Sequence, residues 1–356
     1  MGLPELKIGD LKVKLPIIQG GMGIGISMSK LAAAVANEGG IGIISGAQPG
    51  YREPNFRTEN GLANVTGLIK EIRAARELSP TGAIGVNFLA ATRNYADLVK
   101  AAVQEKVDLI ISGAGLPKTL PELVEGSTTK IAPIVSSGKA AATISKMWSR
   151  KFDRLPDCVI VEGPEAGGHL GFKATDLLAG EVPSIMDIVK EVCTALKPFE
   201  EKYGLKIPVI AAGGLFDGGD VKEALDAGAA GVQMATRFVA TEECDAHVNF
   251  KQAYIDSTEE TIGLVQSPVG LPGRAVQNSF VMRTKEGPLP IDSCYACLLG
   301  CNPKVAPYCI TEALIDSVEG DIDNGLVFIG SNGHRLKEMS TVHQVIEDIK
   351  AEYDAS

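Results

Sequence analysis

The sequence predicts a (β/α)8 TIM barrel, a closed ring of eight parallel strands surrounded by helices, followed by a C-terminal cap or arm. Short apolar runs that end in glycine or another small residue alternate with stretches of helical spacing. Eight such units fit within about 250 residues, the usual size of this barrel. The 356 residues are 45% hydrophobic and include 40 glycines, which suits an α/β enzyme and excludes a disordered chain.

Each predicted strand is a continuous apolar run, as expected when helices cover both faces of a parallel sheet. These strands are Leu15–Gln19, Ile41–Ser45, Ala83–Phe88, Asp108–Ser112, Lys130–Ser136, Cys158–Glu162, Ile207–Ala212 and Gly231–Thr236. An open doubly wound sheet is the alternative, and its fingerprint is G-x-G-x-x-G after the first strand. Residues 20–26 read GGMGIGI, which does not fit that spacing.

The segments between the strands carry apolar residues at helical spacing, and several end at glycine, as helix C-termini prefer. The predicted helices are Ser29–Glu38, Leu62–Leu78, Tyr95–Gln104, Lys139–Arg150, Ile185–Tyr203 and Asp220–Ala227.

The alternation stops near Thr258, so we expect the barrel at residues 1–257 and the arm at residues 258–356. Chain breakers in the arm are Ser267-Pro268, Leu271-Pro272-Gly273 and Pro288-Leu289-Pro290. Two further helices are predicted there, over Thr311–Val318 and Thr341–Glu352.

The charge balance excludes several classes of partner. With 34 basic and 44 acidic residues the net charge is −10, so no net positive field attracts nucleic acid or an anionic membrane. Residues 1–16 lack the apolar core of a signal peptide, and no later apolar run approaches the roughly 20 residues that span a bilayer. We expect a cytoplasmic protein that acts on a small molecule, and a homo-oligomer stays open.

Small residues follow the last two predicted strands. Gly213-Gly214 come after the seventh and Ala235-Thr236 after the eighth. In such barrels the loops at these positions commonly hold a phosphate with backbone N–H groups. We therefore expect one phosphate here, with the Thr236 hydroxyl as a further donor. Plain turn chemistry is the alternative for the glycine pair.

Two other strand ends could contact a flat ring. Gly20-Gly21-Met22 at the end of the first strand offer backbone amides and a thioether. Asn87 closes the third strand with an amide in an otherwise apolar run. The alternative for Asn87 is a side chain that only caps the strand.

His169 is the strongest catalytic candidate, since it lies among glycines directly after the sixth strand. The ordinary pKa of histidine, near 6.5, suits a general base, although a lone histidine is often structural. Glu162 and Glu165 could orient a ligand hydroxyl or the imidazole, or face solvent.

Five ordered motifs carry a family resemblance. They are Gln19–Met22, Gly85–Asn87, Glu162–Gly171, Ala212–Gly214 and Gly231–Phe238. Together they resemble the nitronate monooxygenase (2-nitropropane dioxygenase) family, which also contains FMN-dependent enoyl-[acyl-carrier-protein] reductases. The segment Gly270–Asn278 resembles the part of that family which follows the barrel.

The resemblance implies an FMN-binding barrel with His169 as catalytic base or proton donor. It places the flavin ring against Gly20, Gly21, Met22 and Asn87, and the ring or ribityl chain near Glu162, Gly167 and Gly168. It places the phosphate at Gly213, Gly214, Gln233, Ala235 and Thr236. Two positions depart from the family: Ala235 replaces the usual glycine, and Leu170 stands where many nitronate oxidisers carry arginine.

Three functions are compatible with these residues. The first is oxidation of alkyl nitronates or nitroalkanes with O2 through the flavin, with His169 as base. The alternative is reduction of an enoyl thioester with NAD(P)H, in which case an acyl carrier protein would be the partner. The third is a barrel that binds FMN or another phosphate ligand without catalysis.

Four of the seven cysteines are clustered in the arm, with the spacing Cys294-x2-Cys297-x3-Cys301-x7-Cys309. This clustering favours metal binding or reduced thiols over a disulfide framework. The spacing resembles that of the [4Fe–4S] site in other flavin barrels such as dienoyl-CoA reductases. Zinc and unliganded thiols are the alternatives.

Overall fold

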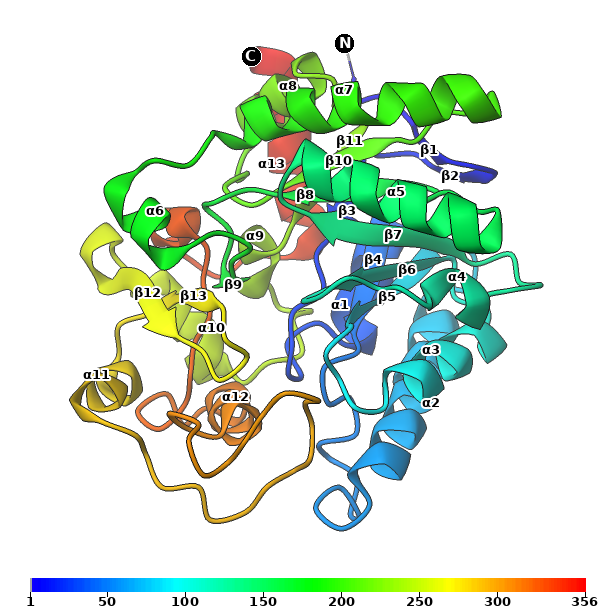
Figure 1. Ribbon diagram of the computed structural model, residues 1–356. Helices are drawn as coiled ribbons and strands as arrows, with labels where there is room; N and C mark the ends of the chain where they lie inside the picture. The colour runs from blue at the N-terminus through cyan, green and yellow to red at the C-terminus, as the bar shows by residue number, and fades with distance from the viewer. Residues whose placement is uncertain (1) are drawn as a thin grey trace.

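The computed structural model describes residues 2–356, and its centre is a closed barrel of eight parallel strands (Figure 1). The barrel strands are β3 (Ile17–Gln19), β4 (Ile41–Ser45), β5 (Ala83–Leu89), β6 (Leu109–Gly113), β7 (Lys130–Val135), β8 (Val159–Glu162), β10 (Val209–Ala212) and β11 (Gly231–Met234). Each strand pairs with its neighbours along the chain, and β11 closes the ring on β3. The predicted barrel is therefore confirmed. The eighth strand is two residues shorter than predicted because a short helix begins at Thr236.

An antiparallel hairpin closes the N-terminal end of the barrel. Its strands are β1 (Leu6–Ile8) and β2 (Leu11–Val13), which the sequence analysis did not predict. Leu6 and Ile8 are buried in one apolar cluster with the inward-facing strand residues, among them Ile41 and Leu109 at strand starts. The filled N-terminal end leaves the opposite end of the barrel for a ligand.

Helices cover the outside of the barrel. They are α1 (Ser29–Asn37), α2 (Asn60–Leu78), α3 (Tyr95–Gln104), α4 (Leu120–Leu123), α5 (Gly138–Phe152), α7 (Ile185–Tyr203) and α8 (Gly218–Asp226). Polar side chains fix several helix starts: Ser137 accepts a hydrogen bond from the Ala140 amide, and Asp217 and Asp220 form a capping box.

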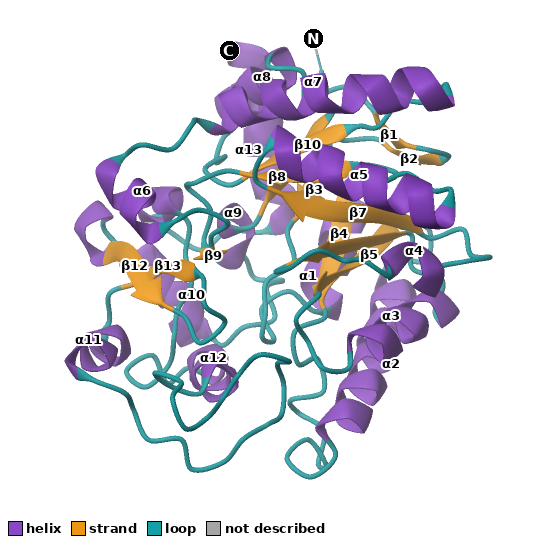
Figure 2. Cartoon of the chain, viewed as in Figure 1, coloured by secondary structure: helices purple, strands orange, loops and turns teal. Residues whose placement is uncertain are grey.

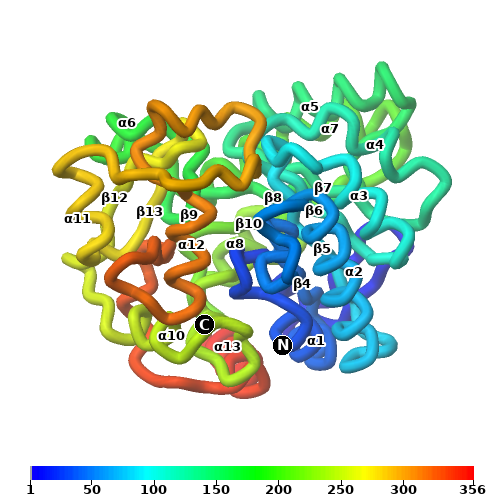
Figure 3. The backbone as a smooth tube through the Cα atoms, turned by 90° about the horizontal axis from the view of Figure 1, so that it is seen from below, coloured from blue at the N-terminus to red at the C-terminus, as the bar shows by residue number. Residues whose placement is uncertain are grey.

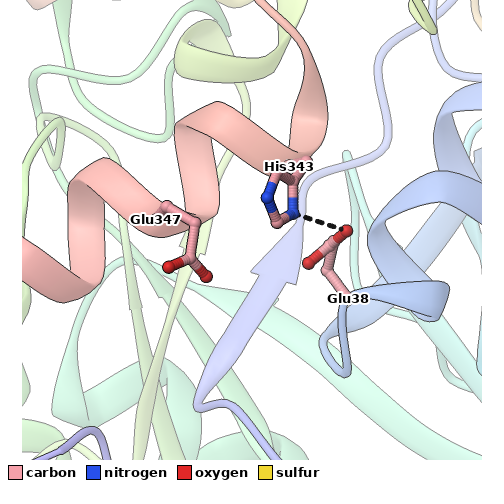
Figure 4. Close-up of side chains that lie close together, drawn as sticks. All are labelled: Glu38, His343 and Glu347. Carbon is pink, nitrogen blue, oxygen red and sulfur yellow. Dashed lines mark hydrogen bonds and ion pairs between the residues drawn. The ribbon is translucent and has the colours of Figure 1, made fainter.

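The last helix of the chain completes the ring. The helix that follows β11, α9 (Thr236–Val239), has only four residues. In its place α13 (Val342–Ala355) packs against both α8 and α1, as Figure 1 shows behind the barrel. His343 of α13 lies 3.1 Å (Nδ1 to Oε1) from Glu38 at the end of α1 (Figure 4).

The rest of the C-terminal region forms an arm beside the C-terminal end of the barrel (Figures 2 and 3). Its elements are α10 (Val248–Ile255), η1 (Glu259–Thr261), β12 (Ile262–Gln266), β13 (Pro272–Val276), α11 (Ser279–Glu286), α12 (Ile310–Glu319) and η2 (Ser331–Arg335). Two elements of the loop after β8 join it, namely β9 (Gly168–His169) and α6 (Ala174–Ala179). The sheet order β12-β13-β9 attaches the arm to the barrel mouth.

Within residues 2–356, no helix combines the length and the apolar character that crossing a bilayer requires.

Candidate active site

Several of the predicted flavin-site residues lie at the C-terminal ends of the barrel strands. Glu162, Ala212 and Gln233 occupy equivalent positions on the neighbouring strands β8, β10 and β11. Asn87 lies at the corresponding end of β5, paired with Ser45 of β4. Strand register alone therefore places these polar side chains around one opening.

The glycines after β3 allow a close approach of three strand ends. A Cβ atom on Gly21 would lie 2.6 Å from the Cβ atom of Asn87. A Cβ atom on Gly20 would lie 3.3 Å from the Cβ atom of Ala235 and from the Cγ atom of Gln233. The structure thus brings Gly20, Gly21, Asn87, Gln233 and Ala235 together.

Only some of the backbone N–H groups predicted to contact a ligand are available at this turn. The Gly20 amide donates to the Met234 carbonyl at 2.8 Å, and the Met22 amide donates to the Ser27 hydroxyl at 2.8 Å. Among the described residues the Gly21 amide has no acceptor. It is therefore the one N–H group of Gly20–Met22 that remains for a ligand.

Two buried amide oxygens in the opening lack hydrogen-bond partners among the described residues. They are Oδ1 of Asn87 and Oε1 of Gln233. An unsatisfied buried polar atom costs about 1–3 kcal/mol, so such atoms usually mark a ligand or water site. A ligand that carries N–H and hydroxyl donors, as a flavin does, would satisfy both oxygens.

The loops after β10 and β11 present free backbone donors. Gly213 and Gly214 have φ angles of +84° and +88°, a backbone conformation that favours glycine. The amides of Gly213, Gly214, Ala235 and Thr236 make no hydrogen bond to the described residues. Four free N–H groups on adjacent loops suit the binding of a phosphate.

The arm covers these loops. The Gly330 amide donates to the Thr236 hydroxyl at 3.2 Å, which leaves the hydroxyl proton for a ligand. The Asn332 side-chain amide donates to the Gly214 carbonyl. A Cβ atom on Gly167 would lie 2.5 Å from the Ile329 carbonyl carbon, so that glycine permits the same segment to approach. No local pattern in the sequence predicts this cover.

His169 lies in β9, where it pairs with Gly273 of the arm strand β13. Its Nε2 atom is 2.7 Å from the Ser267 hydroxyl, and its ring contacts the edge of Phe328 with 5.1 Å between ring centroids. Burial lowers the pKa of His169 to about 4. The imidazole is therefore neutral at pH 7.

Three arm residues around His169 were not predicted as site residues. In the sequence, Ser267-Pro268 indicates only a break in the chain, and no sequence pattern indicates that Phe328 belongs to the site. Arg274 of β13 donates to the carbonyls of Pro164 and Ala166, each at 2.7 Å, and so holds the loop that carries His169. Ser267 lies 98 residues beyond His169, and no local pattern links the two.

The carboxylates near His169 differ in environment. Burial raises the pKa of Glu162 to about 7, so its carboxyl group is partly protonated at neutral pH. Glu165 is exposed. Leu170, at the position where the resemblance leads one to expect arginine, is fully buried.

The four arm cysteines are free thiols, but they are not at zinc spacing. Four thiolates at about 2.3 Å from one zinc ion lie less than about 4 Å apart. Among the described residues, only one group of three possible metal ligands has its ligand atoms within 4.8 Å of one another, and it contains no cysteine. That group is Glu38, His343 and Glu347, which Figure 4 shows, and its two residues on α13 are exposed.

The chain is similar to known proteins over nearly all of its length. The profile described as "Nitronate monooxygenase" matches residues 5–352. A probable nitronate monooxygenase of Staphylococcus aureus is 28% identical over 313 residues, which cover 79% of this chain and 81% of that protein. FabK from Thermotoga maritima has a similar structure, with a TM-score of 0.75, 29% identity and coverage of 96% of this chain and 94% of that one.

A third relative is the (3aS,4S,5R,7aS)-5-hydroxy-7a-methyl-1-oxo-octahydro-1H-indene-4-carboxyl-CoA dehydrogenase of Mycobacterium tuberculosis. It is 28% identical over 275 residues, which cover 77% of this chain. The matched segment spans 66% of that protein's length.

Proposed function

The chain belongs to the nitronate monooxygenase family, and from this membership we propose that it is an FMN-dependent oxidoreductase that oxidises alkyl nitronates or nitroalkanes. The observation that carries this proposal is a single neutral imidazole, that of His169, at the mouth of a barrel whose last two loops carry free amides. Sequence motifs and site geometry point to the same opening.

The residues of the opening fit FMN. The four free amides of Gly213, Gly214, Ala235 and Thr236 would hold the phosphate, and the amide oxygens of Asn87 and Gln233 would accept hydrogen bonds from the ring or ribityl chain. When bound, FMN supplies the redox chemistry, because it accepts an electron pair from an organic substrate and passes it to oxygen.

His169 would take the α-proton of a nitroalkane. The Ser267 hydroxyl contacts Nε2, so Nδ1 remains for the substrate proton. A base whose pKa is about 4 removes this proton less efficiently than a free histidine would. An alkyl nitronate has already lost the proton, and we therefore expect it to be the better substrate.

Reduction of an enoyl thioester is the second candidate, and Leu170 is the observation that favours it. A buried leucine beside His169 offers no positive charge to the nitro group of a nitronate. In this case NAD(P)H would be the reductant and an acyl carrier protein the partner. Neither function requires an iron–sulfur cluster.

Anaerobic reduction of the flavin separates the candidates. Propyl-2-nitronate added to the full-length protein should bleach the flavin absorbance under the proposed function. If the protein is instead an enoyl thioester reductase, NADH or NADPH should bleach the flavin absorbance and crotonyl-CoA should restore it. If no addition changes the spectrum, the protein is a binding barrel and both catalytic proposals are wrong.

A further inference from the structure

The four cysteines of the arm have no part in the proposed flavin reaction. Cys294, Cys297 and Cys301 lie in the long loop between α11 and α12, and Cys309 is the N-cap residue of α12 (Figure 2). All are free thiols, and Cys297 is buried. A buried cysteine near three others in an irregular loop calls for a physical reason.

This loop is attached to the barrel mouth by its backbone. Leu298 forms an antiparallel bridge with Thr92 in the loop after β5. The Arg93 amide donates to the Cys297 carbonyl at 3.1 Å, and the Leu299 amide donates to the Ala91 carbonyl at 2.9 Å. Cys297 is therefore held beside the strand that carries Asn87.

Side chains attach the loop a second time. The ring of Tyr295 lies 5.2 Å from the ring of Phe56 and 5.0 Å from the guanidinium carbon of Arg57. Its hydroxyl donates to Glu312 of α12. Tyr295, one of the two residues between Cys294 and Cys297, is thus fixed to both the barrel and the helix that begins after Cys309.

The local backbone suits thiolate ligands. The Ala296 amide donates to the Cys294 sulfur at 3.3 Å, and Ala296 adopts a positive φ of +51° that closes the turn between the first two cysteines. Cys309 occupies the N-cap position of the ten-residue helix α12, where the helix dipole favours a negative charge. N–H···S bonds and helix N-termini both stabilise deprotonated sulfur.

The thiols share one neighbourhood. Cys301 is close enough to Cys297 and Cys294 for electrostatic interaction, and Cys309 is close enough to Cys297. Four thiolates grouped in this way repel one another unless a cation lies among them.

The geometry points to an iron–sulfur centre, and we propose that the arm binds a [4Fe–4S] cluster through Cys294, Cys297, Cys301 and Cys309. A cubane takes four thiolates, the number that this loop supplies. It also holds them further apart than one zinc ion does, because four iron sites lie between them.

A cavity next to Cys309 provides access to this neighbourhood. Its volume is about 380 Å³, and Ser293, Tyr308, Cys309 and Glu312 are among the residues that line it. A site proposed from ligand geometry also needs an entry path. The cavity reaches one of the four proposed ligands, Cys309.

Metal analysis of the full-length protein tests the proposal. The protein is purified without oxygen and incubated with ferrous iron and sulfide, and iron, acid-labile sulfide, zinc and FMN are measured per chain. About four iron and four sulfide are expected, with an electron paramagnetic resonance signal after reduction by dithionite. Cys294→Ser and Cys301→Ser should lose the iron, the sulfide and the signal.

Cys193→Ser is the matched control, because Cys193 is a partly buried thiol outside the arm. It should keep the iron and sulfide of the unchanged protein. FMN content and far-UV circular dichroism show whether each variant is folded. The proposal would be overturned if the protein held zinc in place of iron or no metal at all. It would also be overturned if folded Cys294→Ser and Cys301→Ser variants retained iron and sulfide. Iron-loaded protein without FMN would contradict the flavin function alone.

Discussion

At the scale of single residues, burial without a charged partner sets the chemistry of the site. It lowers the pKa of His169 to about 4 and raises that of Glu162 to about 7. At pH 7 the imidazole is neutral and the carboxyl group is partly protonated. The partly protonated carboxyl group repels an anionic substrate less than a carboxylate would, whereas the neutral imidazole adds no attraction.

We expect His169→Ala to reduce kcat/KM for a neutral nitroalkane by about 10²–10⁴-fold, the usual contribution of a general base. Turnover of the corresponding nitronate should change little, because no proton has to be removed. Steady-state kinetics with both substrates measure the difference. His343→Ala, at an exposed histidine, is the control. Equal losses for both substrates would show that His169 is not the base.

The raised pKa of Glu162 predicts a pH dependence of stability. The folded-state pKa is above the ordinary value of 4.5, so the favourable contribution is present below pH 4.5 and is lost as the pH rises through about 7. Glu162→Gln should therefore gain stability relative to the unchanged protein between pH 5 and pH 8, by roughly 3 kcal/mol at most. Urea unfolding at several pH values measures this gain, and parallel pH curves would refute it.

At the scale of elements, the loops at the barrel mouth depend on glycine. Gly214 has a positive φ, and a Cβ atom on it would lie 2.6 Å from Oε2 of Glu165 in the neighbouring loop. An alanine there costs about 1–2 kcal/mol in backbone strain alone. The loop would shift to relieve the backbone strain and the close contact with Glu165, and its N–H groups would shift with it.

We expect Gly214→Ala to weaken FMN binding about tenfold, which corresponds to about 1.4 kcal/mol. Gly180→Ala is a matched control, because Gly180 also has a positive φ but has open space around its Cα atom. Fluorescence titration of flavin-free protein gives both dissociation constants. The same weakening in both variants would mean that the loop after β10 does not hold the phosphate.

At the scale of the whole molecule, the chain closes its own barrel with its last helix. Val345, Ile346 and Ile349 of α13 are buried against the barrel. Replacing Ile346 with alanine removes buried methyl groups and leaves a cavity, at a cost of about 2–5 kcal/mol. Ile346→Ala should therefore lower the free energy of unfolding by that amount, as measured by chemical denaturation.

The control for this change is Gln344→Ala, which alters an exposed residue of the same helix. It should change the free energy of unfolding by no more than about 0.5 kcal/mol. Equal effects of the two substitutions would show that α13 contributes little to the barrel.

The sequence by itself determined the barrel. Apolar runs predict strands and helical spacing predicts helices, both are local signals, and the chain repeats the strand–helix unit eight times. It also predicted that Gly20, Asn87, Gly213 and Thr236 surround one opening, since parallel strand ends meet at one rim.

Only the tertiary structure decided what surrounds His169. Ser267 and Arg274 come from the arm and meet the β9 segment across about 100 residues of chain. Phe328 lies further along the chain and reaches the site through its bridge to Ala275 of β13. The β1–β2 hairpin at the N-terminal end of the barrel was likewise not predictable, nor was the packing of α13 against α8 and α1 that completes the ring of helices. Such contacts depend on surfaces that exist only after the barrel has formed, so no local pattern in the chain encodes them.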